Sequence, residues 1–345
     1  MSVRADVIGG GIGGTVAAIA LTAAGLDVEV HESRPRDADK AGWVTLGPAA
    51  MTGLEQIGAA AQLWEQGFPV AKIRSIDPVT GAAKDFARQE PGHRYPSTHV
   101  WRRDLLATLR QRLDEEGITC HYNSTVSAAE LNADLIVGAD GARSATRRFI
   151  GNTTEPNYTG QVIRYGHHPQ PTPDLPDGVL HFWRHDHGTV GYIGDTRDGS
   201  FWFSRYNSET PNISLDQAAM LAPLRKTPVG ALLDDSWVGP CIALYELDPA
   251  GSWHSGNTVI IGDAAHAVSP SAGRGATSTI EDAITLAKYL HSHDYDIPST
   301  FEDFTADRRP TAQTTYRPAP GQRAVAATAD QLDLSTVRVD KRFPQ

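Results

Sequence analysis

The first residues able to do chemistry are three glycines, spaced Gly9-x-Gly11-x-x-Gly14, between an apolar run and a stretch of small residues. Glycine at these places permits a tight turn, close approach of the backbone to a pyrophosphate, and close packing of helix on strand. Glu32 ends the next β-like run roughly 20 residues further on, where a carboxylate can accept ribose hydroxyls. The pattern predicts a dinucleotide site at a helix N-terminus. An ordinary glycine turn is the alternative.

Two further motifs each follow an apolar, strand-like run. Asp140 lies in Ala-Asp-Gly-Ala-Arg-Ser, directly after the run 135–139. Asp263 lies in Gly-Asp-Ala-Ala-His-Ala, after a run that ends at Ile261. This third motif continues through Pro270 to Gly-Arg-Gly-Ala-Thr at 273–277. Continuous apolar runs of this kind are typical of buried parallel strands.

The elements that must position these motifs are of two kinds. Strands are expected at 3–8, 27–31, 118–122, 135–139 and 258–261, and helices at 13–24, 48–57, 102–116 and 274–291. Proline-rich loops and short aromatic strands at 179–183, 189–194 and 200–206 occupy the region after about residue 155, and a further strand is expected at 241–247. Because such strands separated by turn clusters are typical of an antiparallel meander, we expect a Rossmann-like α/β domain interrupted by a β-rich insertion.

Composition excludes several classes of protein. The chain has 345 residues, with 31 basic and 41 acidic side chains and a net charge of −10, which argues against a nucleic-acid binder. The uncharged run 7–26 contains a cluster of glycines that spoils it as a membrane helix, so we expect no membrane span. The two cysteines, Cys120 and Cys241, exclude a disulfide scaffold and fit a cytoplasmic location.

In their order and spacing, the three motifs resemble the FAD-dependent class A flavoprotein monooxygenases of the p-hydroxybenzoate hydroxylase type, from residue 3 to about residue 310. The resemblance implies a discontinuous FAD-binding domain (1–75, 97–155 and 253–345) and an inserted antiparallel β-sheet substrate domain (76–96 and 156–252). It implies FAD as cofactor, NADH or NADPH as a transient reductant, and O2. The substrate implied is a small aromatic or polycyclic molecule, hydroxylated or epoxidised through a flavin C4a-hydroperoxide.

The resemblance also implies roles for individual residues. Arg102 contacts the flavin, Asp140 lies toward the pyrophosphate region and the reductant path, and Asp263 binds ribityl hydroxyls. The helix that begins at Arg274 directs its N-terminus, with roughly +0.5 charge, at the flavin and so favours the anionic reduced form. The full set expected to hold FAD is Gly9, Gly11, Ile12, Gly13, Gly14, Glu32, Ser33, Arg34, Arg102, Asp140, Gly262, Asp263, Gly273, Gly275, Ala276 and Thr277.

Two residues depart from the family pattern, which usually has glutamine at the position of Arg274 and asparagine at that of Thr277. Arg274 either adds a cation near the flavin or substrate, where it would modulate catalysis, or points to solvent. No protein nucleophile is expected, because the flavin carries the chemistry.

The substrate is expected between the insertion and the flavin. Side chains alternate along a strand, so Trp202 faces away from Phe203, and one of the two faces should line the cavity. The candidates are Phe182, Trp183, Tyr192, Trp202 and Phe203, with Pro270 and Gly273 from the other domain. His185 and His187 lack a third ligand group, so no metal is expected there or elsewhere. His266 is interpreted as a packing residue.

Two other functions stay open. One is a flavin-dependent oxidase or dehydrogenase on the same scaffold; the Trp-x-Trp-x-Ile-Pro element of flavin halogenases is absent from the sequence, which disfavours that branch. The other is a non-catalytic binding protein with a dinucleotide fold, of the Rab-escort type. The intact Gly262-Asp263 motif disfavours it.

Overall fold

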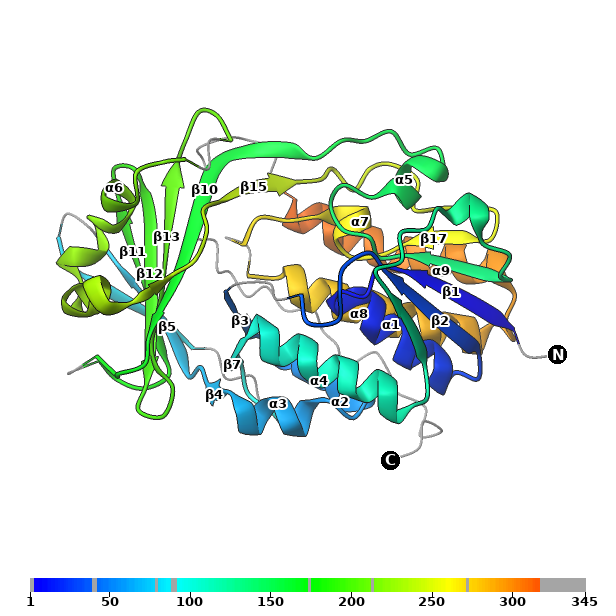
Figure 1. Ribbon diagram of the computed structural model, residues 1–345, viewed down its shortest axis with the longest axis horizontal. Coiled ribbons are helices and arrows are strands. Elements are labelled where there is room, and N and C mark those ends of the chain that lie inside the picture. Colours follow the sequence, from blue (N-terminus) through cyan, green and yellow to red (C-terminus); the bar gives the residue numbers. More distant parts are fainter. Residues whose placement is uncertain are drawn as a thin grey trace.

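The computed structural model describes residues 3–38, 42–77, 80–87, 92–172, 175–211, 214–270 and 273–316. Within these ranges the chain forms two lobes, an α/β lobe and a β-rich lobe, and the long strand β10 (Asn157–His168) runs between them beside β15 (Ile242–Glu246) (Figure 1). The expected combination of a Rossmann-like domain and an antiparallel sheet is confirmed.

A six-stranded sheet forms the centre of the α/β lobe, in the order β16-β17-β9-β1-β2-β8. Its five longer members run parallel, and β16 pairs antiparallel at the edge. The bounds are β1 (Arg4–Ile8), β2 (Asp27–Glu32), β8 (Thr119–Tyr122), β9 (Leu135–Gly138), β16 (His254–Ser255) and β17 (Thr258–Ile260). This topology brings the ends of β1, β9 and β17, which precede the three motifs, to adjacent positions.

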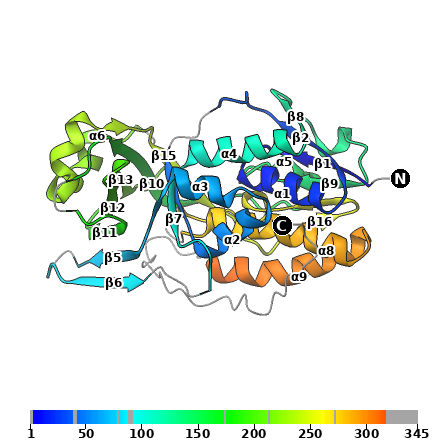
Figure 2. The ribbon, with the colours of Figure 1, turned by 90° about the horizontal axis from the view of Figure 1, so that it is seen from below.

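Helices pack on this sheet around α1 (Ile12–Ala23), which is buried along nearly its whole length. A helix with apolar or small residues on every side belongs inside a core, and α1 contacts both α4 (Arg102–Glu115) and α8 (Gly275–Ser292). The other helices of this lobe are α2 (Pro48–Gln56), α3 (Ala60–Gln66), η1 (Ala128–Glu130), α5 (Ala145–Phe149), α7 (Asp263–His266) and α9 (Ile297–Thr315). Figure 2 shows α4 and α9 on opposite sides of α1 and α8.

The β-rich lobe is an eight-stranded sheet ordered β14-β10-β13-β12-β11-β5-β6, with β15 paired to β10. The remaining strands are β5 (Lys72–Ile76), β6 (Ala83–Ala87), β11 (Val179–His185), β12 (Gly188–Asp195), β13 (Gly199–Asn207) and β14 (Trp237–Val238). All neighbours are antiparallel except β5 and β11. Since β5 starts at Lys72 and pairs throughout with β11, we propose that the domain boundary falls before β5 rather than after residue 75.

Short elements close the two faces of the large sheet. On the outer face, α6 (Gln217–Leu221), η2 (Leu224–Lys226) and η3 (Pro228–Asp235) cover a buried cluster that includes Trp202 (Figure 1). On the inner face lies a small sheet of β3 (Trp43–Leu46), β7 (Thr98–Trp101) and β4 (Phe68–Pro69), in the order β3-β7-β4. The inner face is therefore the one directed at the α/β lobe.

Candidate active site

The glycine-rich turn between β1 and α1 is shaped by two close backbone contacts. Gly9 has φ +108°, and a Cβ there would lie 2.4 Å from the Ala139 carbonyl oxygen. A Cβ on Gly14 would lie 1.8 Å from the Gly9 carbonyl oxygen. In contrast, a Cβ on Gly11 would meet nothing within 4 Å. The first two positions are thus required by the turn, whereas Gly11 faces open space where a ligand can approach.

The N-terminus of α1 fits an anionic ligand. Its N-cap residue is Gly11, which supplies no side-chain hydrogen bond, and the first turn holds no acidic residue. The free N–H groups and the helix dipole both favour negative charge at such an end. A pyrophosphate group, the part of FAD expected here, matches this end of the helix.

Glu32 lies beside the turn, at the end of β2. Its Oε2 accepts a hydrogen bond from the Gly10 N–H at 2.7 Å, and its Oε1 accepts one from the Arg34 N–H at 2.9 Å. The Ser33 hydroxyl donates to Oε1 at 3.4 Å. A carboxylate offers about four lone-pair directions, so Glu32 retains acceptor capacity for a ribose hydroxyl. The side chain is thus held at the place where the sequence predicts it.

Asp140, in the second motif, serves its own turn. Its Oδ2 accepts hydrogen bonds from the backbone N–H groups of Ala145 (2.8 Å) and Thr146 (3.0 Å), and its Oδ1 accepts one from the Ser144 hydroxyl. The carboxylate therefore caps α5 and shapes the turn that packs under Gly9. The expected position of Asp140 toward the pyrophosphate region and the reductant path stays a prediction.

The third motif lies against the first through a residue that the sequence reasoning missed. Thr279, on α8, places its Cγ2 where a Cβ on Gly13 would be 2.5 Å away and a Cβ on Gly262 2.8 Å away. Both glycines thus leave room for one side chain of α8. The signal in the sequence was the pair of glycines, Gly13 in the first motif and Gly262 in the third, because a glycine leaves room for a neighbouring side chain. The sequence does not identify Thr279 as that side chain.

Asp263 begins α7, after Gly262 with φ +58°. Its side chain is exposed, and its carboxylate accepts no hydrogen bond from the described part of the chain. It is thus available to a ligand hydroxyl. Gly275 opens α8, whose first turn holds no acidic residue and whose N-cap residue, Arg274, gives no side-chain hydrogen bond. This second uncapped helix N-terminus also fits an electron-rich group.

A buried ionic network holds the third motif in place. Asp282, fully buried on α8, accepts hydrogen bonds from the Gly262 N–H (2.9 Å), from His266 Nε2 (2.5 Å) and from Arg308 Nε on α9 (2.8 Å). Burial alone would raise the pKa of Asp282, but His266 and Arg308 outweigh it and hold the pKa at about 2. Burial lowers the pKa of His266, and Asp282 raises it by more.

This network adds to the packing role expected for His266. The imidazole stacks on Trp253 at 5.2 Å and also binds Asp282. Arg147 supplies a second link, because its fully buried guanidinium donates from Nη1 to the Ala264 carbonyl at 3.0 Å and thereby joins α5 to α7. Sequence reasoning missed these partners, since they lie 16 to 117 residues apart in the chain.

The two arginines singled out in the sequence lie in different surroundings. Arg102 opens α4, where its N–H donates to the Gly42 carbonyl at 3.1 Å, and its charge acts on the Tyr165 phenol of β10. Arg274 extends along α8 toward Glu281, with Nη2 3.9 Å from Oε2, and its side chain is 35% exposed. Arg274 therefore pairs with its own helix. Thr277 is buried beside Gly47, and Ala276 is half-buried.

The structure divides the expected substrate residues between the two faces of the large sheet. Trp202 and Tyr192 are buried in the outer cluster under η2 and η3, and Trp183 packs against that cluster. Phe203 and Phe182 lie on the inner face, against Trp43 of β3. This outer face points away from the α/β lobe and is covered by α6, η2 and η3, so we do not propose Trp183, Tyr192 and Trp202 as substrate contacts. Pro270 and Gly273 are exposed.

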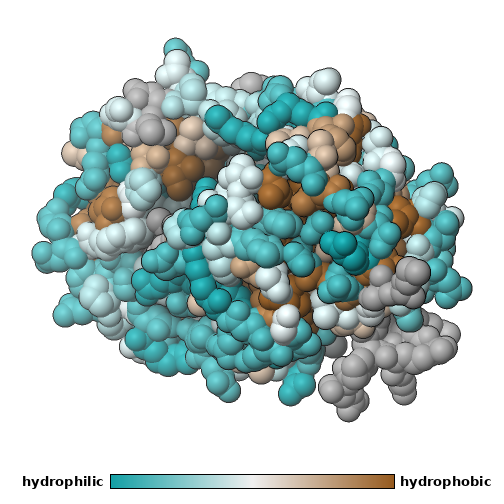
Figure 3. Space-filling view, turned by 45° about the vertical axis from the view of Figure 1, so that its right-hand side comes forward, coloured by the Kyte–Doolittle hydropathy of each residue, from teal (hydrophilic) through white to brown (hydrophobic). Residues whose placement is uncertain are grey.

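Aromatic rings join the inner face to the small sheet. Trp101 of β7 lies 4.8 Å from His167, 5.0 Å from Phe201 and 6.2 Å from Trp237, of which Trp237 is 45% exposed. Trp43 lies 5.8 Å from Phe203. Burial, with a smaller effect of His167, lowers the pKa of the nearby His99 to about 3, so this imidazole is neutral. Figure 3 shows a recess between the two lobes with apolar side chains in part of its wall.

Two other features complete the description. No helix in the ranges that the structure covers is long and apolar enough to cross a bilayer. Cys120 and Cys241 are both free thiols.

Comparison with known proteins assigns the family. A model of the family described as "FAD binding domain" matches residues 93–319, well over half of the chain. The chain is 29% identical to 6-hydroxynicotinate 3-monooxygenase of Bordetella bronchiseptica, over 83% of this chain and 82% of that protein. It is 27% identical to 3-amino-4-hydroxybenzoate 2-monooxygenase PtmB3 of Streptomyces platensis, over 91% and 86%.

Solved structures share the fold. The chain resembles CtdE in complex with FAD and substrate 4, with a TM-score of 0.78 and 20% identity over 91% of this chain and 87% of that one. It resembles Klebsiella pneumoniae HpxO complexed with FAD and uric acid, with a TM-score of 0.74 and 21% identity over 90% and 85%. The match to the family model, together with the motifs and the fold, shows that the chain belongs to the FAD-binding-domain family and is a class A flavoprotein monooxygenase of the p-hydroxybenzoate hydroxylase type.

Proposed function

We propose that this protein is an NAD(P)H- and O2-dependent hydroxylase or epoxidase of a small, flat aromatic or polycyclic molecule. The observation that carries the proposal is the aromatic inner face of the β-rich sheet, directed at the lobe that bears the three FAD motifs. An apolar wall opposite a cofactor site is the usual form of a small-molecule pocket.

FAD would be held by residues that the structure already positions. The Gly9–Gly14 turn and the N-terminus of α1 would hold the pyrophosphate, Glu32 the ribose, and Asp263 the ribityl chain. The evidence is the open space at Gly11, the hydrogen-bonded placement of Glu32 and the free carboxylate of Asp263. When bound, FAD supplies the electron transfer and oxygen activation.

The chain's own residues would then orient the reactants and exclude water. The uncapped N-terminus of α8 would place positive potential beside the cofactor. Oxygen transfer requires that water be excluded from the reaction site. The walls that exclude it would be formed by Trp43, Trp101 and Phe203. Arg102, at the start of α4, would add a cation near the same place. No second glycine fingerprint is present in the sequence, so we infer that the nicotinamide docks transiently.

The substrate proposed is neutral or weakly polar where it meets the sheet. Burial lowers the pKa of His167 and His99, so both imidazoles are neutral hydrogen-bonding groups rather than cations. Two relatives are named for 6-hydroxynicotinate and 3-amino-4-hydroxybenzoate, each a single substituted ring. A ring of this size suits packing against the exposed side chain of Trp237. We place the enzyme in the cytoplasm, where free thiols persist.

The test is a screen of hydroxylated aromatic acids and bicyclic phenols for accelerated NADH or NADPH oxidation by the FAD-loaded protein. The true substrate should raise the rate sharply, and product made under labelled O2 should carry one labelled oxygen atom. Product that forms without label, with all oxygen released as peroxide, would identify an oxidase and refute the proposal. Phe149→Ala serves as a control because it removes an exposed aromatic side chain of α5. Its substrate-dependent oxidation of NADH or NADPH should match that of the wild type.

A further inference from the structure

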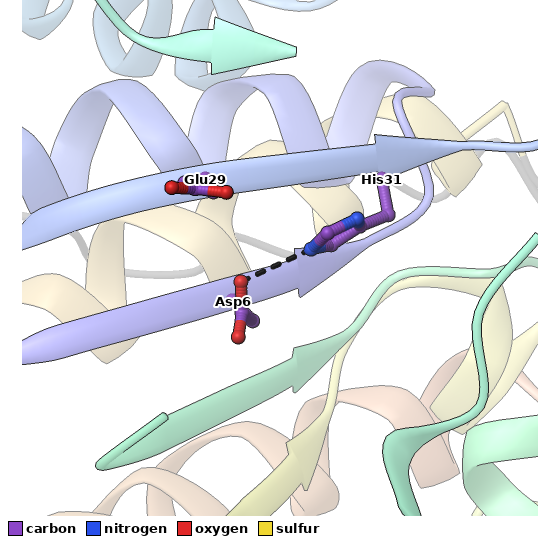
Figure 4. A group of neighbouring side chains, drawn as sticks. All are labelled: Asp6, Glu29 and His31. Carbon is purple, nitrogen blue, oxygen red and sulfur yellow. Dashed lines mark hydrogen bonds and ion pairs between the residues drawn. The ribbon is translucent and has the colours of Figure 1, made fainter. Parts of the chain in front are cut away.

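A cluster of polar side chains lies on one face of the α/β sheet, the face of β1 and β2 to which Asp6 points. Asp6 on β1 is the register partner of Glu29 on β2, and both point to the same face as His31 (Figure 4). His31 Nε2 lies 3.0 Å from Asp6 Oδ1. One ligand atom from each of the three side chains lies within 4.8 Å of the other two. Three groups of metal-ligand type thus converge on one point.

A fourth group of the same type adjoins them on β8. His121 is the register partner of His31, and the two imidazoles stack at 5.1 Å. His121 Nε2 lies 2.7 Å from Glu29 Oε2. The cluster therefore contains two imidazoles and two carboxylates on three neighbouring strands.

The charges of this cluster favour a cation. Asp6 is only 5% exposed, and a buried carboxylate is costly unless a positive partner neutralises it. Within the described part of the chain, no lysine or arginine forms an ion pair with Asp6 or Glu29.

We propose that Asp6, Glu29 and His31 form a structural site for one divalent transition-metal ion, best matched by Zn²⁺, with His121 holding Glu29 in place. Zinc is held in proteins by imidazole nitrogen and carboxylate oxygen at about 2.0–2.2 Å, in tetrahedral geometry. Such a tetrahedron has ligand atoms about 3.3 Å apart. The N···O separation between His31 and Asp6, 3.0 Å, is close to that edge length. This site departs from the expectation that the chain holds no metal.

The ion would tie together the strands that carry the FAD turn. Asp6 lies shortly before Gly9 on β1, and His31 directly precedes Glu32 on β2. Because Gly9 N–H already donates to the His31 carbonyl at 2.8 Å, an ion bound by His31 and Asp6 would fix both sides of the turn. Its role would be structural, because it would hold β1 and β2 together beside the FAD turn.

The experiment titrates ZnCl2 into the tag-free, FAD-loaded full chain after treatment with a chelator, using calorimetry and elemental analysis. We expect one Zn²⁺ per chain and a higher melting temperature with zinc. Glu29→Gln and His121→Gln change exposed side chains, so their folding in chelator should match that of the wild type. Glu29→Gln removes a ligand and should weaken zinc binding by ~100-fold or more, whereas His121→Gln removes the partner of a ligand and should weaken it by ~10- to 100-fold.

The matched control is His293→Gln, which removes another histidine paired with a carboxylate, Asp303, at 2.9 Å. It should bind zinc like the wild type. The proposal is overturned if the wild type binds no stoichiometric zinc, or if the double variant Glu29→Gln/His121→Gln binds as tightly as the wild type. Asp6→Asn extends the test to the buried ligand, and its melting temperature should no longer respond to zinc.

Discussion

Replacing Asp282 with asparagine should destabilise the FAD lobe strongly. The change keeps the shape of the side chain and removes the charge that faces His266 and Arg308. The difference between the ordinary carboxyl pKa of 3.8 and the value of about 2 corresponds to about 2 kcal/mol of stabilisation at neutral pH. Arg308 would also lose its buried Asp282 partner and keep only the ion pair with Glu281, and breaking a buried ion pair costs about 3–5 kcal/mol in total.

The measurement is the melting temperature of the FAD-loaded protein, followed by flavin fluorescence. If each kcal/mol moves the melting temperature by roughly 2 °C in a chain of this size, Asp282→Asn should lower it by about 6–10 °C. FAD should also be lost more readily on desalting, because Asp282 accepts the Gly262 N–H. The control is Asp303→Asn, since the exposed His293–Asp303 pair contributes only about 0–1 kcal/mol.

The pH dependence has a definite sign. The pKa of Asp282 is lowered, so its stabilisation is present above pH 3.8 and lost as pH falls toward 2. The pKa of His266 is raised, so its stabilisation is complete below pH 6.5 and fades as pH rises through the raised value. The difference between wild type and Asp282→Asn should therefore be largest between about pH 4 and 6.5. Equal destabilisation by Asp282→Asn and Asp303→Asn would refute the reasoning.

Three further predictions concern the cofactor and the substrate. Glu32→Ala should weaken FAD binding by about 1–3 kcal/mol, the usual loss for hydrogen bonds to a charged group, as measured by quenching of flavin fluorescence; an unchanged affinity would mean that Glu32 does not hold FAD. Gly11→Ala should weaken FAD binding but leave the melting temperature of the FAD-free protein unchanged. Gly14→Ala should destabilise the fold itself, because its Cβ would strike the Gly9 carbonyl. The same behaviour from both variants would contradict the open space at Gly11 and the close contact at Gly14. Trp237→Ala should raise KM for the aromatic substrate while Tyr192→Phe, on the outer face, leaves it unchanged, and steady-state kinetics with the identified substrate distinguishes the two faces.

Local pattern was enough to predict the FAD-binding lobe. Gly9, Gly11 and Gly14 are close in the chain, and their requirements are backbone requirements that one turn and one helix satisfy. The position of Glu32 follows from the rise of one strand and the length of one helix. The strand and helix periods then identified the elements before the second and third motifs. These predictions succeeded because the interactions involved are short in sequence and repeat with a fixed geometry.

Other features depended on packing between distant segments. Asp282, His266 and Arg308 meet only after α8 and α9 fold back on the third motif, and nothing in their spacing identifies them as partners. Trp202 and Phe203 are neighbours with similar side chains, and alternation places them on opposite faces without saying which face looks at the flavin lobe. The tertiary structure decides it, because η2 and η3 cover Trp202 and leave the face of Phe203 toward the flavin lobe. Likewise, Asp6 and His121 lie on separate strands, and only the parallel order of β1, β2 and β8 brings them to one surface.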